Sequence, residues 1–468
     1  MPGAHALARR ERLPFGVDPE LVFDALFADD SHAFWLDARI RDGGVSRLGA
    51  ASSERPSYIV SEGVAREVVD GRALDTAVDL TRVIRDAVAT ADTSVAGSPL
   101  GWVGWFGFEH GARALGVAAA ESPWPDVALI AADRVIEFDH SSGALSLWFV
   151  DDEDGRAWAA ATRDLLASLS TRSSTKDAVS PRAEAIGAAT APRPHAAEPV
   201  WRHSDADYLR MIEHCQLAIR AGDAYQLCLT NAIRVQTDAR PLDVYRRLRR
   251  DSPAPYGGFV RFGDVSLLSS SPELFLHVAD GLAVTSPVKG TARRLPDPVD
   301  DARLKEALGR DEKERAENLM IVDLMRNDLS RVARLGGVVV TTLLEVETHR
   351  HVHQLVSTVV AQLADGVDAL NVLEACFPAG SMTGAPKLSA MGILHGLENG
   401  PRGIYSGCFG WLGLDGSADL AMVIRSIVMR SGEAAIGTGG GITALSVPER
   451  ELAEIKLKAA ALLAALDA

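Results

Sequence analysis

The sequence predicts a soluble α/β protein, and three observations support this fold class. The chain has 468 residues, a length typical of two or three domains or of one large α/β unit. Hydrophobic residues make up 47% and charged residues 24%, the composition of a globular protein with ample core. From about residue 200 onward, helical and strand patterns alternate along the chain.

Charge and cysteine usage exclude several classes of function. The formal net charge of −15 argues against a nucleic-acid-binding surface, which needs a basic patch. The four cysteines form no C-x-x-C pair, so neither a disulfide framework nor a thiolate zinc site is indicated. The opening MPGAHALARRERLPFG lacks the apolar core of a signal peptide, and no run of about 18 apolar residues predicts a membrane helix. We therefore expect a cytoplasmic protein without nucleic-acid or membrane partners.

A segment rich in Ser, Thr, Ala and Pro, residues 168–199, is typical of a disordered linker. It separates an N-terminal region, residues 1–167, from a second region, residues 200–468. In the N-terminal region, strands are predicted at AFWLDARI, RVIEFDH and ALSLWFV, and a helix from Asp75 to Ala91. The glycine-aromatic run PLGWVGWFGFEH suits a tight turn and a buried strand.

The second region is predicted to begin with a helix, YLRMIEHCQLAIRA, that ends near Gly222 and is followed by a strand. SLLSSSPELFLHV and LAVTSPVKGTAR predict antiparallel strands joined by a turn at Asp280–Gly281. KERAENLMIVDLMRNDLSRVA predicts a helix, and ERELAEIKLKAAALLAALDA predicts an amphipathic terminal helix. The apolar face of the first of these two helices is predicted to hold Ala316, Leu319, Met320 and Leu324.

Two of these helices carry carboxylates in register. Glu314 and Glu317 are three residues apart in KERAEN, and Glu451, Glu454 and Lys458 follow one helix face in ERELAEIKLK. Paired carboxylates from two helices can hold Mg²⁺, which prefers oxygen ligands and keeps waters that a substrate can displace. The same spacing is more often found on solvated helix faces with Glu–Lys pairs, so spacing alone does not decide.

Other segments leave the same choice between a site and an ordinary structural feature. In FPAGSMTGAPK, Ser381 or Thr383 is predicted to cap a helix whose free amides suit an anion, although an ordinary capped helix fits equally. GTGGGIT, residues 437–443, would let backbone amides approach a ligand, or it would form a strained turn. Arg425 interrupts the apolar strand AMVIRSIVM and needs a partner, either a substrate carboxylate or a structural Asp. Glu273 in SPELF, at the start of a strand, is more often a turn residue than an acid.

Together these segments resemble the chorismate-utilising enzymes, which include the anthranilate, aminodeoxychorismate, isochorismate and salicylate synthases. The resemblance is dense from Tyr208 to Leu463. It rests on segments in the family's order: SPELF, SPVKGTARR, DEKERAENLMIVDLMRNDL, HQLVSTV, FPAGSMTGAPK, IYSGCFGWLG, AMVIRSI, GTGGGIT and ERELAEIKLK. It implies two β-sheets packed face to face with helices outside, chorismate as substrate, and Mg²⁺ at the ring carboxylate of chorismate.

The same resemblance implies a role for each candidate site residue. Glu317 and Glu454 are expected to be the direct metal ligands, with Glu314 and Glu451 in support. Glu273 is expected to be the general acid that helps the C4 hydroxyl leave, which suits a buried glutamate with a raised pKa. The groups expected to hold the enolpyruvyl carboxylate or to line the ring site are Tyr405, Arg425, Lys458, the amides of Gly440 and Gly441, Thr383 and His353.

Two positions distinguish the reactions within the family. Gln226 stands where isochorismate and salicylate synthases carry a water-activating lysine. Lys289 in SPVKGTARR stands where aminodeoxychorismate synthases carry a lysine and the other branches an alanine. In that branch the lysine amine attacks C2 as the C4 hydroxyl leaves, and ammonia then attacks C4 and expels the lysine. The expected product is 4-amino-4-deoxychorismate, for 4-aminobenzoate and folate, with anthranilate synthesis as the alternative.

An amine nucleophile has to be neutral, so desolvation or a cationic neighbour is expected to lower the pKa of Lys289. No glutaminase segment with a nucleophilic cysteine in a glycine elbow is recognised, so ammonia is expected from a separate glutamine amidotransferase subunit. A catalytically dead relative that only binds such a subunit is the non-enzyme alternative. The presence of Glu273, Lys289, Glu317 and Glu454 argues against it.

Overall fold

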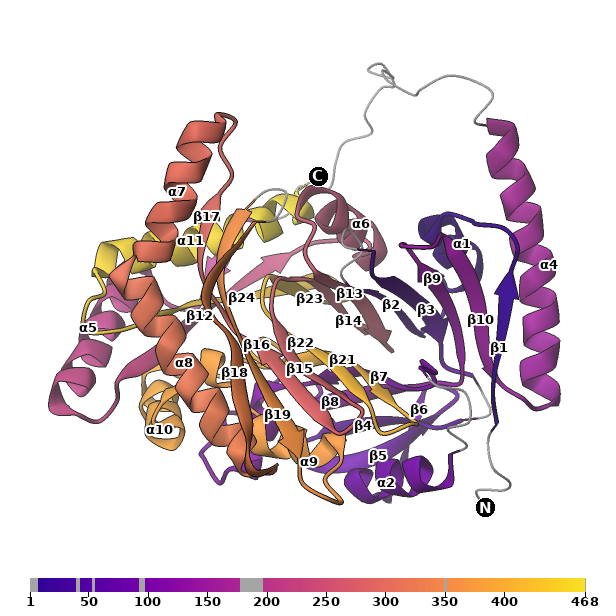
Figure 1. Ribbon diagram of the computed structural model, residues 1–468, viewed down its shortest axis with the longest axis horizontal. Coiled ribbons are helices and arrows are strands. Elements are labelled where there is room, and N and C mark those ends of the chain that lie inside the picture. The colour runs from indigo at the N-terminus through magenta and orange to yellow at the C-terminus, as the bar shows by residue number, and fades with distance from the viewer. Residues whose placement is uncertain are drawn as a thin grey trace.

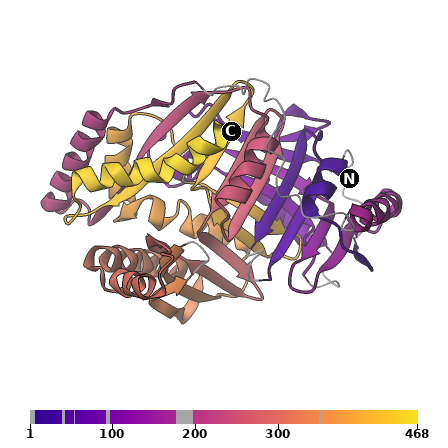
Figure 2. The ribbon, with the colours of Figure 1, turned by 90° about the horizontal axis from the view of Figure 1, so that it is seen from above.

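The computed structural model describes residues 7–38, 43–52, 55–91, 97–176, 197–348 and 352–467. Within these residues the chain forms two twelve-stranded antiparallel sheets that pack face to face, with helices outside (Figures 1 and 2). This arrangement confirms the predicted fold class. No helix among these residues is long and apolar enough to cross a membrane. All four cysteines are buried free thiols.

The first sheet has its ends at β1 and β11, and the short β20 pairs with β12. Its order is β1 (Ala8–Leu13), β10 (Ala144–Val150), β9 (Arg134–Asp139), β3 (Val45–Ala50), β2 (His32–Ala38), β13 (Tyr256–Phe262), β14 (Val265–Ser271), β23 (Ser426–Arg430), β24 (Glu433–Ile442), β12 (Gln226–Gln236) and β11 (Val200–Trp201), with β20 at Gly384–Ala385.

The second sheet runs from β17 to β6, and the long β18 pairs with β19. Its order is β17 (Val288–Arg293), β19 (Val352–Leu363), β16 (Leu282–Ser286), β15 (Leu274–Ala279), β22 (Ala418–Met422), β21 (Cys408–Gly413), β7 (Gly101–Phe106), β8 (Val127–Ala132), β4 (Ser57–Ser61), β5 (Val64–Val69) and β6 (Arg72–Ala77), with β18 at Ala333–Thr348.

The helices cover the outer faces and the ends of these sheets (Figure 1). They are α1 (Pro19–Leu26), α2 (Leu80–Thr90), α3 (Phe108–Ala114), α4 (Glu153–Lys176), α5 (Asp205–Ala221), α6 (Pro241–Asp251), α7 (Pro298–Arg310), α8 (Glu312–Ser330), α9 (Ala369–Cys376), α10 (Lys387–Glu398) and α11 (Pro448–Leu466), with a 3₁₀ turn η2 (Gly380–Met382).

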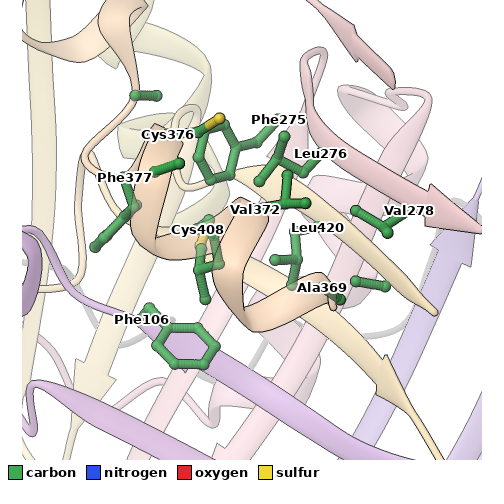
Figure 3. Packing of buried hydrophobic residues seen from close by; sticks show 14 of the residues in the cluster. Phe106, Phe275, Leu276, Val278, Ala369, Val372, Cys376, Phe377, Cys408 and Leu420 are labelled. Carbon is green, nitrogen blue, oxygen red and sulfur yellow. The ribbon is translucent and has the colours of Figure 1, made fainter. Parts of the chain in front are cut away.

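Apolar side chains from both sheets fill the space between them. One cluster joins Phe34 and Val260 of the first sheet to Trp105 and Ile130 of the second, all of them fully buried. A second cluster lies under α9, where Figure 3 shows helix residues such as Val372 beside strand residues of the second sheet. Burial of this many aromatic and branched side chains is the main stabilising contribution to such a fold.

Both regions of the sequence contribute strands to both sheets. β2 pairs with β13 in the first sheet, with Trp35 opposite Phe259, and β7 pairs with β21 in the second. Residues 168–176 of the predicted linker are helical, because α4 extends to Lys176. Residues 177–196 lie outside the described residues, so a linker there stays a prediction.

Several local predictions are confirmed. The run AFWLDARI overlaps β2, and the runs RVIEFDH, ALSLWFV and PLGWVGWFGFEH contain β9, β10 and β7. α5 ends at Ala221, and Gly222 takes the left-handed conformation with φ 86° that terminates a helix. Asp280 and Gly281, with φ 50° and 72°, form the tight turn between β15 and β16.

Two predictions about helices are wrong. The helix expected from Asp75 begins at Leu80, because Asp79 caps it by accepting a hydrogen bond from Arg82 N at 3.0 Å. The face of α8 that is buried holds Ile321, Val322, Met325 and Leu329 instead of the predicted stripe. At its start this inner face is polar, with Glu317 and Asn318 buried, so apolar periodicity placed the face incorrectly.

Candidate active site

Lys289 lies at a β-bulge that glycine makes possible. The register of β17 against β19 shifts between Lys289 and Thr291. Gly290 lies at this shift with φ 72°, a conformation that side chains rarely adopt. A Cβ at Gly290 would lie 3.1 Å from Glu314 Oε2, so glycine also lets α8 pack against the bulge. Bulges redirect side chains, and this one holds Lys289 beside the glutamates of α8.

The surroundings of Lys289 are acidic. Burial alone lowers the pKa of Lys289, but the negative charges of Glu317, Glu273 and Glu314 outweigh it, so the pKa is raised above its ordinary value. The expectation of a lowered pKa is therefore wrong for this structure, because carboxylates rather than cations surround the amine. The ammonium form of Lys289 is therefore favoured near neutral pH.

Glu273 lies between β14 and β15, and its carboxyl group is suited to exchange a proton. Only 5% of its surface is exposed. Burial raises the pKa of Glu273 to about 7, while Lys289, a hydrogen bond with Ser381 and the charge of Lys458 act in the lowering direction. Such a carboxyl group can gain and lose a proton near neutral pH, as a general acid must.

The carboxylates of α8 and α11 meet across a single lysine. Glu317 and Glu451 are 4% and 2% exposed. Lys313 Nζ lies 2.6 Å from Glu451 Oε1 and 3.5 Å from Glu317 Oε1. Burial raises the pKa of Glu317 to about 7. Burial also acts to raise the pKa of Glu454, but Lys458, whose Nζ lies 2.7 Å from Glu454 Oε1, lowers it overall.

The GTGGGIT segment is part of β24, so the alternative of a strained turn is wrong. A Cβ at Gly441 would lie 2.8 Å from Glu317 Oε2 and 2.4 Å from Gln226 Nε2. A Cβ at Gly440 would lie 3.3 Å from Glu451 Oε2. The glycines therefore give the strand a surface flat enough for the carboxylates of two helices to approach its backbone.

The glutamates of α8 and α11 have the ligand type that Mg²⁺ prefers, but their side chains do not converge on one point as metal ligands do. No group of three or more acidic, histidine or cysteine side chains in the described ranges is arranged to hold a metal ion. Lys313 lies between Glu317 and Glu451 instead. The donors are nevertheless all carboxylate oxygens, as Mg²⁺ prefers. Among the described residues Glu317 Oε1 has no hydrogen-bond partner, and Lys313 Nζ lies 3.5 Å from it, so a cation bound more closely would reduce the cost of burying this oxygen.

Gln226 contributes a second unsatisfied group. Its side chain is 1% exposed, and neither Nε2 nor Oε1 has a hydrogen-bond partner among the described residues. A buried amide without partners costs free energy that a ligand or a water molecule can recover. Gln226 therefore marks, beside Gly441, a place where a polar molecule is expected.

Arg425 supplies a cation close to this place. The structure puts it between β22 and β23, which belong to different sheets, and not inside one apolar strand as the sequence suggested. Its φ of 51° marks the point where the chain crosses over. The guanidinium makes no hydrogen bond or ion pair with any residue that the structure describes, so the expected structural Asp is not found there. Burial lowers the pKa of Arg425, opposed by the nearby Tyr405 and Glu454.

Comparison with known proteins identifies the arrangement. The family description "chorismate binding enzyme" matches residues 50–464. The chain belongs to the chorismate binding enzyme family. It is 42% identical to an aminodeoxychorismate synthase of Streptomyces griseus over 97% of this chain and 64% of that protein, so it spans about two thirds of the length of that relative.

Anthranilate synthases are also similar to this chain. Component 1 from Streptomyces coelicolor is 35% identical over 98% of this chain and 88% of that protein. The crystal structure of anthranilate synthase component I from Streptococcus pneumoniae superposes with a TM-score of 0.74 at 25% identity, covering 97% of this chain and 99% of that one. The chain therefore shares its fold with an anthranilate synthase component I, while its sequence is similar both to an aminodeoxychorismate synthase and to anthranilate synthases.

Among the residues proposed from the family resemblance, Tyr405 and Lys458 lie close to the glycines of β24 and to Arg425. The ring of Tyr405 packs on Gly437, where a Cβ would lie 2.0 Å from ring atom Cγ. Lys458 Nζ donates to Gly439 O at 3.0 Å. Arg425 and Tyr405 influence each other's pKa, and Lys458 influences that of Glu273, so these charges share one region.

Thr383 and His353 are placed differently. The Thr383 hydroxyl donates to Ala379 O at 3.1 Å, and α10 begins after Pro386 without a side-chain cap, so the predicted Ser or Thr cap is wrong. The ring nitrogens of His353 contact Thr348 Oγ1 and Asp301 Oδ1, both at 3.0 Å. In this structure His353 therefore braces α7 against β19, and its role at the ring of chorismate stays a prediction.

Sequence reasoning missed two residues on α8. Lys313, next to Glu314 in KERAEN, is the bridge between the helices. Asn318 fixes α8 to the second sheet: its Nδ2 donates to Leu355 O at 3.3 Å, and its Oδ1 accepts from Ser357 Oγ. A buried asparagine directly after Glu317 is the signal that could have shown which face of α8 turns inward.

Proposed function

We propose that this chain is component I of an aminodeoxychorismate synthase, which converts chorismate and ammonia to 4-amino-4-deoxychorismate and water. The observation that supports it best is Lys289 at the bulge of β17, beside both Glu273 and Glu317. The similarity to the Streptomyces aminodeoxychorismate synthase supports the same reaction. The product would lead to 4-aminobenzoate and folate.

Binding of chorismate, a dianion, follows from the charges of the site. Arg425, which has no described partner, and Lys458 with Tyr405 would hold the enolpyruvyl carboxylate, together with the amides of Gly440 and Gly441. Glu317 and Glu454 would hold Mg²⁺, supported by Glu314 and Glu451. Bound there, Mg²⁺ would supply positive charge for the ring carboxylate of chorismate.

The chemistry then uses Glu273 and Lys289 in two steps. In the first, the neutral amine of Lys289 forms a bond to C2, both ring double bonds shift by one bond, and the C4–O bond breaks. The Glu273 carboxyl donates its proton, so that water leaves. In the second, ammonia forms a bond to C4, both double bonds shift back and the bond from Lys289 to C2 breaks. The surplus proton on the new amine returns to the Glu273 carboxylate.

The neutral amide of Gln226 cannot accept a proton from water, which argues against hydroxylation at C2. Ammonia would come from a glutamine amidotransferase subunit on a separate chain. Anthranilate synthesis is the second candidate, because the chain covers most of the length of the Streptomyces coelicolor anthranilate synthase component 1. Lys289 favours amination at C4 over this alternative.

Product identification tests the proposal. The purified chain is incubated with chorismate, Mg²⁺ and ammonium, and the products are separated by chromatography. We expect 4-amino-4-deoxychorismate, which an added lyase converts to 4-aminobenzoate, and we expect chelation with EDTA to stop the reaction until Mg²⁺ is restored. Anthranilate as the main product would establish the alternative, and unconsumed chorismate would indicate a protein without this activity.

A further inference from the structure

We infer that Lys313 is the internal counter-ion of the carboxylate site: its ammonium holds Glu317 and Glu451 together in the metal-free protein and releases them when Mg²⁺ binds. Lys313 thereby sets the affinity of the site for the metal. This inference rests on the proposed Mg²⁺ site, and it assigns to Lys313 a positioning role that is separate from the steps of the reaction.

The geometry of Lys313 joins two helices that are far apart in sequence. Lys313 lies in the first turn of α8, and its Nζ pairs with Glu317 one turn later on the same helix. The same ammonium lies 2.6 Å from Glu451 Oε1 on α11. Because Glu317 and Glu451 are almost fully buried, their mutual repulsion is poorly screened, and a cation between them is needed to hold them close.

The neighbouring lysines do not take this place. Lys458 pairs with Glu454 of its own helix and donates to Gly439 O. Lys289 is held by the bulge on β17, with no ion pair to α11 among the described residues. Lys313 is therefore the lysine whose ion pairs, in the described part of the chain, connect the carboxylates of α8 to those of α11.

Lys313 and a divalent cation compete for these carboxylates. The ammonium donates a hydrogen bond to Glu451 Oε1 at 2.6 Å and forms a looser ion pair with Glu317 Oε1 at 3.5 Å, so a cation that binds Glu317 has to displace it. This competition accounts for a carboxylate-rich site in which no three ligands converge within the part of the chain that the structure describes. A lysine that has to be displaced also favours a doubly charged cation over a singly charged one, because only the former exceeds the charge that it replaces.

Lys313→Met tests the inference, because methionine keeps an unbranched side chain and removes the charge. Mg²⁺ binding is measured by isothermal titration calorimetry without chorismate. We expect the Kd for Mg²⁺ to fall about 10-fold or more in the variant, the size expected for a close charge pair. In the absence of Mg²⁺ we expect a lower Tm for the variant than for the wild type, and a larger rise in Tm when Mg²⁺ is added.

Lys456→Met is the matched control, since Lys456 is an exposed residue of α11 that pairs with Asp205. Its Kd for Mg²⁺ should equal that of the wild type. An unchanged or weaker affinity in Lys313→Met overturns the inference and leaves the metal site intact. Absence of Mg²⁺ binding in both the wild type and Lys313→Met overturns the proposed metal site and this inference with it, whereas product formation is judged separately.

A measurement on the wild type covers the case in which Lys313→Met does not fold. Acetylation of lysines is followed by mass spectrometry with and without Mg²⁺. We expect Mg²⁺ to increase the labelling rate of Lys313, because its ammonium is released, and to leave that of Lys456 unchanged. Equal labelling of Lys313 under both conditions, at Mg²⁺ concentrations that shift the Tm, would overturn the inference.

Discussion

At the scale of single residues, the proposed mechanism depends on how Glu273 and Lys289 are protonated. The pKa of Glu273 is about 7 and that of Lys289 is raised above its ordinary value, so the ionised pair predominates at pH values between the two. The reactive arrangement carries the same number of protons, with the proton on Glu273 and a neutral Lys289. In the proposed mechanism, transfer of a proton from Lys289 to Glu273 would therefore prepare both groups at once.

The proposed proton transfer predicts the direction of the pH dependence. Below pH 7 both groups are protonated, and one proton has to be lost before Lys289 can attack. We expect kcat/KM for chorismate to rise as pH increases through about 7 and then to level off until Lys289 titrates. The assay holds the concentration of neutral ammonia constant.

Glu273→Gln is the test of this assignment. It should lower kcat by about 100-fold to 10,000-fold, because the amide cannot donate the proton that the leaving hydroxyl needs. The inflection near pH 7 should also disappear. An inflection that persists in Glu273→Gln would assign it to another group, of which Glu317, with a similar pKa, is the first candidate.

Lys289 should form a covalent adduct that does not depend on ammonia. When the wild type is mixed with chorismate and Mg²⁺ alone, we expect intact mass spectrometry to show the chain enlarged by chorismate minus water. Lys289→Ala should show no adduct because it lacks an amine. Lys289→Arg should show none because its guanidinium keeps the charge but is not deprotonated in proteins. An adduct in either variant, or a wild-type rate of amination in Lys289→Ala, would exclude the covalent step.

At the scale of elements, β24 shows how a strand is fitted to the helices beside it. A Cβ at Gly441 would overlap the side chains of Gln226 and Glu317, so Gly441→Ala has to displace at least one of them. We expect a loss of stability of about 1–3 kcal/mol, as for other overpacked sites, and a raised KM for chorismate. Denaturant unfolding and steady-state kinetics measure the two effects.

Gly396→Ala is the control for this change. Gly396 is exposed within α10, and a Cβ there would meet no atom within 4 Å. Alanine is the better helix former, so this variant should be more stable by about 0.5–1 kcal/mol with unchanged kinetics. A Gly441→Ala variant that behaves like Gly396→Ala would show that the glycines of β24 are not needed for close approach.

The elements also show what sequence patterns could and could not predict. Strand and helix periodicity predicts β9, α5 and α11 correctly, because the pattern of apolar residues within each segment is enough to define it. The glycine run of β24 was not recognised as a strand, because the reason for its glycines lies in α8 and α11, which are distant in sequence. The crossing at Arg425 was hidden for a similar reason, since one apolar run feeds two sheets. Lys313 went unnoticed because its partner Glu451 is on another helix.

At the scale of the whole molecule, the two regions of the sequence are built into each other. β2 of the N-terminal region lies between β3 and β13, and β7 lies between β8 and β21. Aromatic residues of both regions, such as Trp35 and Phe259, are fully buried together. Removing the N-terminal region would expose apolar surface and unpaired strand edges in both sheets, and such surface favours aggregation.

This interleaving predicts that neither region folds alone but that the covalent connection between them is dispensable. Residues 197–468 expressed alone should be insoluble or unfolded, because β13 and β21 lose their partners. Co-expressed with residues 1–176 as a separate chain, they should form a soluble complex that aminates chorismate, since β2 with β13 and β7 with β21 already pair the two regions within the described residues. Co-purification through a tag on one chain, followed by the product assay, measures the outcome.

A shorter N-terminal chain, residues 1–91, provides the control. It carries β2 and β3, which pair beside β13, but it lacks β9 and β10 of the first sheet and β7 and β8 of the second, so β3 and β21 are each left without a neighbour. We expect it to rescue neither solubility nor activity, whereas residues 1–176 rescue both. A soluble, active chain of residues 197–468 would show the opposite: that the second region is an independent domain, and that the buried contacts across both sheets contribute little to its stability.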